Sequence, residues 1–456
     1  MKIRIAISAL LLSVSSISQG QAVPTATTSM VPSNSGLNFN PLDGVFHYAL
    51  SGSEIVQLGY YGPSQTTYST VFSGNAAYTA KSEVRPFNIL FGGGVSLGNQ
   101  SGQGTTSFWN VAVSQGYVTR SWIFNISDSF NFLPQSPTTG LSGIPGVGDL
   151  GAVPIPGPAT GPAGGVLSNS GNRIGNSLSG SVERQLDHAT SISGNGSWTI
   201  LRFLDQSANT ANTGGLDSTQ ISGNLGLNRR LDGRSSVSLN AVYSTYSYNG
   251  ASSFFPGTTI SYAQPDVETR GINVSYQRTL SRSLSVSVSA GPQWVSSSNS
   301  ALIPSNVNVF ATAGVTYSRG LTNASVSYSH GVNAGSGVLP GALSDSVTGS
   351  LGHPYGRDWV ASISAAYTHT AGLTQVAALV PGAPPNLVYD TVFGGGQVTR
   401  RISAHFSGYI SYQAQNQSNN YSLTGQTAVR NALNGTSQTF GVGITFSPRS
   451  TRLGQF

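Results

Sequence analysis

The chain has 456 residues, of which 8% are charged, and its formal net charge is +6. Average soluble domains carry about 25% charged residues, so most of the polar surface of this protein must come from uncharged side chains. The chain contains no cysteine, which excludes disulfide-stapled small domains and a lipid-anchored lipoprotein. The small excess of basic residues is too thin and too scattered to indicate a nucleic-acid-binding protein.

The N-terminus has the pattern of an export signal. Two basic residues, Lys2 and Arg4, precede a short apolar stretch, and small residues follow it near Ala22. Residues 1–22 are therefore predicted to be a secretory signal peptide, and residues 23–44 to be a polar leader. No later segment offers the roughly 20 consecutive apolar residues that a membrane helix needs. The sequence accordingly predicts an exported protein that is either soluble or a β-barrel.

The N-terminal third contains segments in which apolar and polar residues alternate. Alternation with period two is typical of β-strands that have one apolar face. A charged turn, KSEVRP at residues 81–86, separates one pair of these segments, and VTRS at residues 118–121 separates the next pair. The expected strands are residues 46–60, 67–80, 87–97, 106–117 and 122–133.

The last of these strands places a carboxylate among apolar residues. Asp128 shares its parity with Trp122, Phe124, Ile126 and Phe130. In a membrane barrel this parity would put Asp128 on the lipid face near the middle of the bilayer, where a charge is costly. Two explanations are open: a β-bulge that turns Asp128 inward, or a subunit interface that buries it.

Residues 134–170 form a long segment rich in Pro and Gly. Asp149 is its only charged residue. The frequent Pro and Gly exclude a regular strand or helix here. Either the segment is a flexible external loop, or it folds into the lumen of a barrel and narrows it.

One hairpin design recurs along the rest of the chain. In residues 270–294, Ile272, Val274 and Tyr276 alternate with polar residues before a basic turn, and a second alternating run begins at Leu284. The spacing of these hairpins is uneven, which argues against a β-solenoid, whose repeats have a nearly constant length. Arginines mark the short turns, including Arg184, Arg230, Arg278, Arg319 and Arg400.

Short turns alternate with longer connections rich in Gly, Ser, Asn and Pro. This asymmetry is typical of transmembrane barrels, which have tight periplasmic turns and longer extracellular loops. The strands approach the length of about 9 to 11 residues that a tilted strand needs to cross a bilayer. Counting to a last strand at residues 439–446 gives about eighteen strands, within an accepted range of about fourteen to eighteen. The longer connections include residues 203–217, 249–264, 297–305, 372–386 and 417–437.

Aromatic residues lie at two levels of the predicted strands and share the parity of the apolar residues. We interpret them as the aromatic girdles of a membrane barrel, although aromatic residues also favour strands in general. Those near the short turns are Tyr276, Tyr317 and Trp359, and those toward the long connections are Tyr243, Trp294, Tyr367 and Tyr412.

The last alternating run is TFGVGITF, in which Phe440 and Phe446 bound one apolar face, and SPRSTRLGQF after it does not continue the alternation. Either Phe456 lies on a bent strand as an assembly signal, or the strand ends at Phe446 and a short tail follows. Over about nine tenths of its length the sequence resembles a bacterial outer-membrane β-barrel of the porin type, including the barrels encoded with exopolysaccharide export loci. The resemblance is architectural and carries no specific motif. Members of this class usually end on an aromatic residue that the assembly machinery recognises, and this chain ends at Phe456. The resemblance implies a transmembrane, antiparallel, up-and-down barrel over residues 45–456.

The sequence predicts no catalytic, cofactor-binding or metal site. His405 and Ser407 resemble the His and Ser of outer-membrane phospholipases, but that pair faces the lipid, whereas here Phe406 and Ile410 hold the lipid-facing parity. The six His are dispersed, and no cysteine is available as a metal ligand. The runs FGGGV and FGGGQ lie inside strands with no helix after them, so they indicate curvature or close packing rather than phosphate binding.

These features predict a passive, weakly selective channel in the bacterial outer membrane, for small polar solutes or polysaccharide. The alternative is a non-conducting barrel with a structural or adhesive role. Expected partners are outer-membrane lipids and the barrel-assembly machinery, with a homo-oligomer as a further option. Because the lumen-facing parity is mostly uncharged, we expect at most a mild anion preference, set by the turn arginines. The alternative interpretation is that these arginines have no effect on ions and only stabilise the turns and contact lipid headgroups.

Overall fold

The computed structural model describes residues 44–59, 66–80, 82, 84–98, 105–133, 173–204, 217–249, 265–333, 335, 339–375, 386–420, 435–448 and 451–452. Within these residues the chain forms a closed antiparallel barrel of eighteen long strands, with one short extra strand. The predicted all-β, up-and-down fold is confirmed, and the strand number lies at the upper end of the expected range. The signal peptide, nearly all of the leader, the segment 134–170 and Phe456 lie outside the described residues.

The strands have the following bounds: β1 Gly44–Leu58, β2 Thr66–Ala80, β3 Phe87–Gly98, β4 Thr105–Val118, β5 Trp122–Leu133, β6 Arg173–Gln185, β7 Thr190–Phe203, β8 Asp217–Arg230, β9 Ser235–Asn249, β10 Val267–Ser281, β11 Leu284–Ser297, β12 Asn306–Arg319, β13 Thr322–Asn333, β14 Ala342–Tyr355, β15 Trp359–Gly372, β16 Val388–Arg401, β17 Phe406–Asn419, β18 Gly435–Phe446 and β19 Thr451–Arg452. No helix in these ranges is long and apolar enough to cross a membrane.

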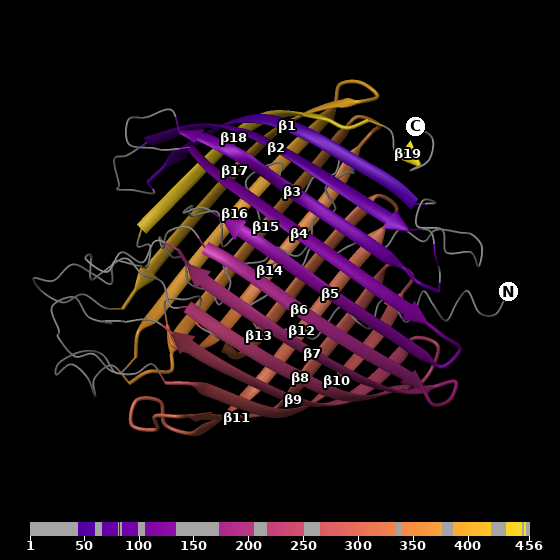
Figure 1. Ribbon diagram of the computed structural model, residues 1–456, viewed down its shortest axis with the longest axis vertical. Helices are drawn as coiled ribbons and strands as arrows, with labels where there is room; N and C mark the ends of the chain where they lie inside the picture. Colours follow the sequence, from indigo (N-terminus) through magenta and orange to yellow (C-terminus); the bar gives the residue numbers. More distant parts are fainter. Residues whose placement is uncertain are drawn as a thin grey trace, which may run out of the picture.

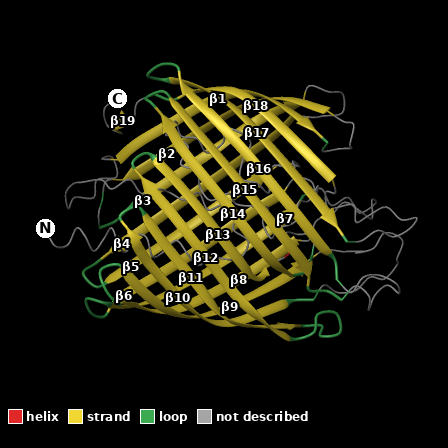
Figure 2. Cartoon of the chain, turned by 180° about the vertical axis from the view of Figure 1, so that it is seen from behind, coloured by secondary structure: helices red, strands yellow, loops and turns green. Residues whose placement is uncertain are grey.

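Each strand pairs with its neighbours in the chain, and β1 closes the ring by pairing with β18. The closing register runs from Leu50 opposite Phe446 to Leu58 opposite Gln438. The short β19 adds to β1 beside Val45. Closure requires tilted strands, and Figures 1 and 2 show the front and back walls of the barrel crossing for this reason.

The two ends of the barrel differ in their connections. At one end, tight turns join successive strands, such as residues 231–234 between β8 and β9 and residues 320–321 between β12 and β13. We call this the short-turn end; β1 starts and β18 finishes there, on the right of Figure 1. The opposite end, where the longer connections lie, is the long-loop end. The predicted asymmetry of turns and loops is therefore confirmed.

The strands are longer than the sequence suggested. They run from 12 residues in β3 to 15 residues in β9, beyond the length of about 9 to 11 that a bilayer requires. The extra residues continue the hydrogen-bonded pairing at both ends, as in β14 and β15, which pair from Ala342 opposite Gly372 to Tyr355 opposite Trp359.

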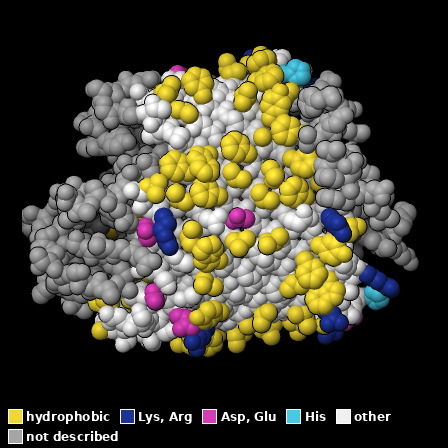
Figure 3. Space-filling model, in the orientation of Figure 1, with side chains coloured by type: hydrophobic (Ala, Val, Ile, Leu, Met, Phe, Trp, Pro, Cys, Tyr) yellow, Lys and Arg dark blue, Asp and Glu magenta, His cyan; other side chains and the backbone are white. Residues whose placement is uncertain are grey.

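The outer face of the barrel is apolar. Leu225 and Ile410 are each 68% exposed, and Ile363 is 57% exposed. Hydrophobic side chains cover much of the face drawn in Figure 3. Monomeric soluble proteins rarely expose contiguous apolar patches larger than a few hundred Å², so this surface is suited to an apolar surrounding. Six of the predicted girdle residues are exposed on this outer surface: Tyr276, Trp359, Tyr243, Trp294, Tyr367 and Tyr412.

The expected β-bulge at Asp128 is wrong. Strand β5 pairs without interruption with β4 on one side and with β6 on the other, and Asp128 lies opposite Val113 and Leu178. An unbroken register on both sides leaves no extra residue that could invert the parity. Asp128 is therefore exposed on the outer face, in line with Ile126.

Candidate functional site: the inner wall of the barrel

The inner wall is lined by small, uncharged polar residues. Since successive side chains point to opposite faces, a strand that places apolar residues outward places the intervening polar residues inward. On β10, for example, Val274 is 52% exposed on the outer face, while Asn273 is 5% exposed on the inner face. Other buried inward-facing residues include Ser53, Thr67, Asn75, Asn131, Thr199, Gln220, Asn224, Asn240, Thr391, Gln417 and Thr439.

Hydrogen bonds between neighbouring strands connect this polar layer. Ser177 Oγ lies 3.1 Å from Thr199 Oγ1 across β6 and β7, and Asn240 Nδ2 donates to Asn273 Oδ1 at 3.1 Å across β9 and β10. These contacts satisfy polar groups without any charge. Similar hydroxyl pairs are Ser127 with Ser179, Ser197 with Ser222, Ser275 with Ser289, Ser325 with Ser350 and Ser327 with Thr348.

Acidic and basic side chains are sparse on the inner wall. Among the described side chains of the strands, those with inward parity are Glu183, Arg230 and Arg401. All three lie in the last residues of their strands, at the short-turn end. The middle of the inner wall, as far as its side chains are described, is therefore neutral.

The glycine run of β3, FGGGV, permits close packing on the inner wall, one of the two roles that the sequence indicated. A Cβ atom at Gly92 would lie 2.5 Å from Asn110 Oδ1 and 2.6 Å from Asn75 Oδ1. A Cβ atom at Gly94 would meet the Phe72 carbonyl oxygen at 2.3 Å and the Phe108 ring at 2.7 Å. The inward space above these glycines is thus filled by side chains from β2 and β4.

An apolar cluster lies against the inner wall at the long-loop end. Strands β9 to β11 contribute inward-facing Tyr246, Tyr248, Val267 and Val295, and the connection between β11 and β12 contributes Leu302 and Ile303, with Val332 of β13 beside them. We call these residues the mouth cluster. The Gln375 amide after β15 donates to the Leu302 carbonyl at 2.8 Å. The sequence did not predict this cluster, because its members come from segments far apart in the chain.

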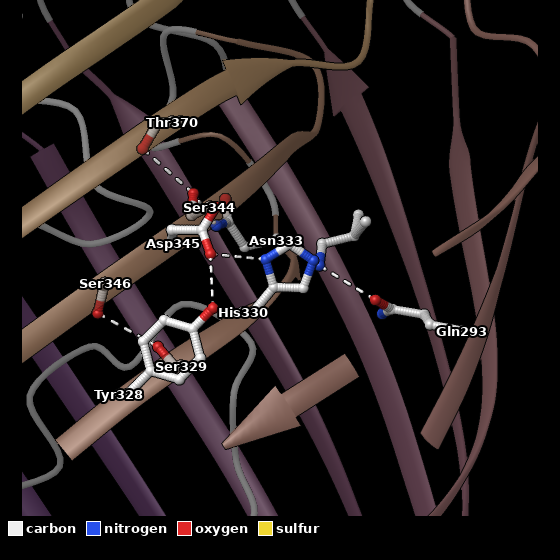
Figure 4. Close-up of polar contacts among 10 residues, drawn as sticks. Gln293, Tyr328, Ser329, His330, Asn333, Ser344, Asp345, Ser346 and Thr370 are labelled. Carbon is white, nitrogen blue, oxygen red and sulfur yellow. Dashed lines mark hydrogen bonds and ion pairs between the residues drawn. The ribbon is translucent and has the colours of Figure 1, made fainter. Parts of the chain in front are cut away.

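The outer face carries two matching polar groups near the long-loop end. Tyr328 Oη and His330 Nδ1 lie 2.8 and 2.7 Å from Asp345 Oδ1, and Figure 4 shows both side chains pointing at this carboxylate. On the next hairpin, Tyr367 Oη and His369 Nδ1 each lie 2.8 Å from Asp390 Oδ1. The repeated Tyr-x-His spacing in YSH and YTH was a sequence signal for these groups.

The same view separates the two faces of β13 and β14. Ser329 and Ser346, which alternate with the residues of the outer group, bond to each other at 3.2 Å, and Ser344 bonds to Thr370 at the same distance. The outer group is therefore distinct from the inner wall, although Asp345 stands between Ser344 and Ser346 in the chain.

The short turns depend on side-chain acceptors that the sequence analysis missed. Asp232 Oδ1 accepts hydrogen bonds from the amides of Arg234 and Ser235 at 2.6 and 2.7 Å. Asp187 does the same in the turn between β6 and β7. These backbone N–H groups hold the pKa of both carboxyls below their ordinary value of 3.8. Ser403 occupies the equivalent place before β17.

Most of the predicted turn arginines face outward. Arg184 lies over the Trp122 ring and Arg400 over the Trp359 ring, each with Cζ 5.1 Å from the ring centroid. Arg278 and Arg319 also have outward parity, and Arg230 alone of the five turns inward, where Nη2 donates to the His188 carbonyl. Figure 3 shows basic side chains beside the short turns.

His405 and Ser407, which the sequence analysis compared with the phospholipase pair and set aside, lie apart in the described chain. His405 lies exposed in the last short turn, with its ring 6.3 Å from that of Phe446. Ser407 lies on the inner wall opposite Thr445. As predicted, Phe406 and Ile410 are exposed on the outer face. No group of His, Asp and Glu in the described ranges could hold a metal ion.

Comparisons with known proteins concern the architecture. No family model matches the chain, and no curated protein matches it. Among solved structures, OccK2 of Pseudomonas aeruginosa is 11% identical with a TM-score of 0.43, over 90% of this chain and 99% of that chain. OpdO of the same organism is 8% identical, with a TM-score of 0.41 over 89% and 97%. The FrpB iron transporter from Neisseria meningitidis is 7% identical, with a TM-score of 0.42 over 89% and 81%.

Proposed function

We propose that this chain is a bacterial outer-membrane barrel that forms a passive, weakly selective channel for small polar solutes. The observation that carries the proposal is the contrast between the two faces of one wall: apolar residues outside and an uncharged polar layer inside. An eighteen-stranded barrel encloses a lumen too wide for wall side chains to fill. A polar wall around such a lumen suits water and uncharged solutes.

Some polar atoms of the inner wall have no partner among the described residues. Gln57 Nε2, Gln220 Oε1 and Gln413 Oε1 are covered atoms that form no hydrogen bond with the described part of the chain. Buried polar atoms of folded proteins are normally bonded to protein or to water. These side chains all have inward parity, so the unpaired atoms belong to the polar inner wall.

Conductance measurements in planar lipid bilayers test the proposal. The purified barrel is expected to give stepwise current increases. Their size should follow the bulk conductivity of each chloride salt, because the described middle of the inner wall carries no charge that would favour one ion. Absence of current steps from correctly folded barrel would contradict the channel.

The alternative, a non-conducting barrel with a structural or adhesive role, is favoured by the mouth cluster. Tyr246, Ile303 and Val267 are each at most 1% exposed, so an apolar mass occupies part of the mouth at the long-loop end. In the same bilayer experiment, a wild-type barrel without current and a Tyr248→Ala variant with current would support this alternative. A polysaccharide conduit is a special case of the channel, and larger solutes in swelling assays would identify it.

A further inference from the structure

Asp128 is an anomaly on the apolar outer face. It lies at the middle of β5, with Phe124 and Ile126 toward the short-turn end and Phe130 and Phe132 toward the long-loop end. A carboxyl group at this height would face the hydrocarbon of a bilayer, where polar groups are costly.

Apart from Glu54 of β1, which accepts a hydrogen bond from the Thr70 hydroxyl at 2.8 Å, the other outward-facing carboxylates of the described strands lie at a different level. Glu268, Asp345 and Asp390 are within the first four residues of β10, β14 and β16, at the long-loop end. There the edge of a bilayer offers water and headgroups. The position of Asp128 therefore cannot be explained in the same way.

The strands beside β5 extend the apolar surroundings of Asp128. Val113 of β4 and Leu178 of β6 lie directly opposite it, and Trp109 of β4 stacks on Phe130 with ring centroids 4.8 Å apart. The resulting patch, which we call the β4–β6 face, consists of large apolar side chains around one polar centre.

The polar centre has a second member, Asn176 of β6. Asn176 Nδ2 donates to Asp128 Oδ1 at 2.9 Å and to the Ser129 carbonyl at 3.3 Å. The amide nitrogen of Asn176 is thus bonded twice within the chain. Asp128 Oδ2 and Asn176 Oδ1 form no hydrogen bond with the described residues, and both belong to outward-facing side chains.

We propose that the β4–β6 face binds a second copy of this chain in a two-fold symmetric dimer. The proposed dimer includes one proton on each Asp128 carboxyl group, because two charged carboxylates covered by the two apolar faces would be costly; the proton gives each group one O–H donor. In the dimer, the Asp128 hydroxyl of each copy donates to the Oδ1 atom of Asn176 of the partner subunit.

A second copy fits this face better than a lipid does. The centre offers one donor and one acceptor side by side, and a two-fold axis turns such a pair into two reciprocal hydrogen bonds. Lipid chains offer neither group. Apolar packing alone does not drive association within a bilayer, because lipid chains are as apolar as the protein surface. The polar pair therefore decides whether the faces associate.

Single-cysteine cross-linking in lipid vesicles tests the geometry, since the chain has no cysteine of its own. Leu178→Cys places a thiol beside Asp128, and Ile363→Cys places one on the outer face of β15, away from the proposed interface. Oxidation is expected to give a covalent dimer with Leu178→Cys and little with Ile363→Cys. Equal yields at both positions, or no dimer with Leu178→Cys, would overturn the proposal.

Sedimentation equilibrium in density-matched detergent tests the polar pair. Asp128→Leu removes both reciprocal hydrogen bonds and is expected to weaken dimerisation by about 30-fold. Asp128→Asn retains a donor and is expected to dimerise like the wild type. Glu54→Leu, which removes an outward carboxylate of β1, is the matched control and should also dimerise normally. A monomeric wild type, or an Asp128→Leu variant that dimerises normally, would overturn the proposal.

Two further measurements distinguish loss of the dimer from misfolding and from loss of the proposed channel. Heat-modifiable gel mobility verifies that each variant is folded, and Asp128→Leu is expected to pass because it removes a polar group from the outer face. The conductance of a single barrel should be the same for Asp128→Leu and the wild type. Loss of current would therefore concern the channel, and loss of cross-linking would concern the dimer.

Discussion

In the short turns, single side chains accept hydrogen bonds from backbone amides that have no partner strand at this point. Asp187 and Asp232 each accept two backbone N–H groups with one carboxylate oxygen. Turns in which Asp or Ser bonds to the backbone two and three residues later are common for these residue types. The arginines that mark the same turns in the sequence mostly face outward, so they are not the residues that fix the turn conformation.

The Asp232 turn is expected to lose stability in acid. Its carboxyl has a pKa below 3.8 in the folded chain, so its contribution to the free energy of unfolding is present above that ordinary value and is lost as the pH falls through the lower folded value. Asp232→Ala should therefore destabilise the barrel at neutral pH and have little effect once the wild-type carboxyl is protonated. The free energy of unfolding of both proteins, measured by urea unfolding in vesicles at neutral pH and at a pH below the pKa of the folded carboxyl, tests this.

Ser403→Ala is the control for that experiment. The Ser403 hydroxyl accepts the amides of His405 and Phe406 at 3.3 and 3.2 Å in an equivalent turn, but it does not titrate. Its destabilisation should be the same at both pH values. An Asp232→Ala effect that is equally independent of pH would contradict the role of the ionised carboxylate.

Arg230 is the turn arginine placed to influence ions. It has inward parity at the short-turn end, whereas Arg278 has outward parity. Charges act over about 8 to 10 Å at physiological salt, so only the entrance is affected. In the proposed channel, Arg230→Gln should reduce a mild anion preference in reversal potentials, and Arg278→Gln should not. Strong cation selectivity of the wild type would contradict the neutral inner wall.

At the scale of one strand, the two parities of β15 predict opposite responses to the same charge. Ile363 lies on the outer face midway between the girdle residues Trp359 and Tyr367, and Ser364 lies on the inner wall. Ile363→Arg should reduce the free energy of unfolding in vesicles by about 2 to 4 kcal/mol. Ser364→Arg should be tolerated, because its charge can reach the lumen. Equal costs would show that both faces have similar surroundings.

Strand positions and parity followed from local patterns. The alternation of Ile272, Val274 and Tyr276 sufficed to place β10, because a period of two determines which side chains share a face. The polar inner wall followed from the same rule. The strand ends did not, since pairing with neighbours lengthens a strand beyond its apolar segment, as in β1, where pairing with β2 begins at Gly44.

Features that depend on register between strands could not be predicted. Asp128 fits either a bulge or a regular strand by its local pattern, and only the pairing with β4 and β6 decides between them. The bonds from Tyr328 and His330 to Asp345 require the register of β13 against β14, which the connecting loop determines. The contact between Leu302 and Gln375 needs the curvature of the whole barrel.

For the whole molecule, closure is the property with the clearest consequence. A closed barrel has no free edge strand, so removing any one strand from the ring breaks the ladders on both of its sides. We therefore expect the detergent-extracted protein to resist unfolding in dodecyl sulfate until heated, and to migrate faster before heating than after. Recovery of the folded protein in solution without detergent would contradict an outer face designed for lipid.

A variant at the seam separates closure from general stability. Val442 of β18 lies opposite Glu54 of β1 and opposite Ile410 of β17, so Val442→Pro removes a backbone donor from the ladders that close the ring. The fast-migrating form should be lost or should convert at a lower temperature. Ile444→Leu, two residues along the same outer face, keeps the backbone donor and should behave like the wild type. If Val442→Pro retained the wild-type conversion temperature, pairing between β1 and β18 would contribute little to the barrier to unfolding in dodecyl sulfate. The resistance to the detergent would then come from pairing within the hairpins.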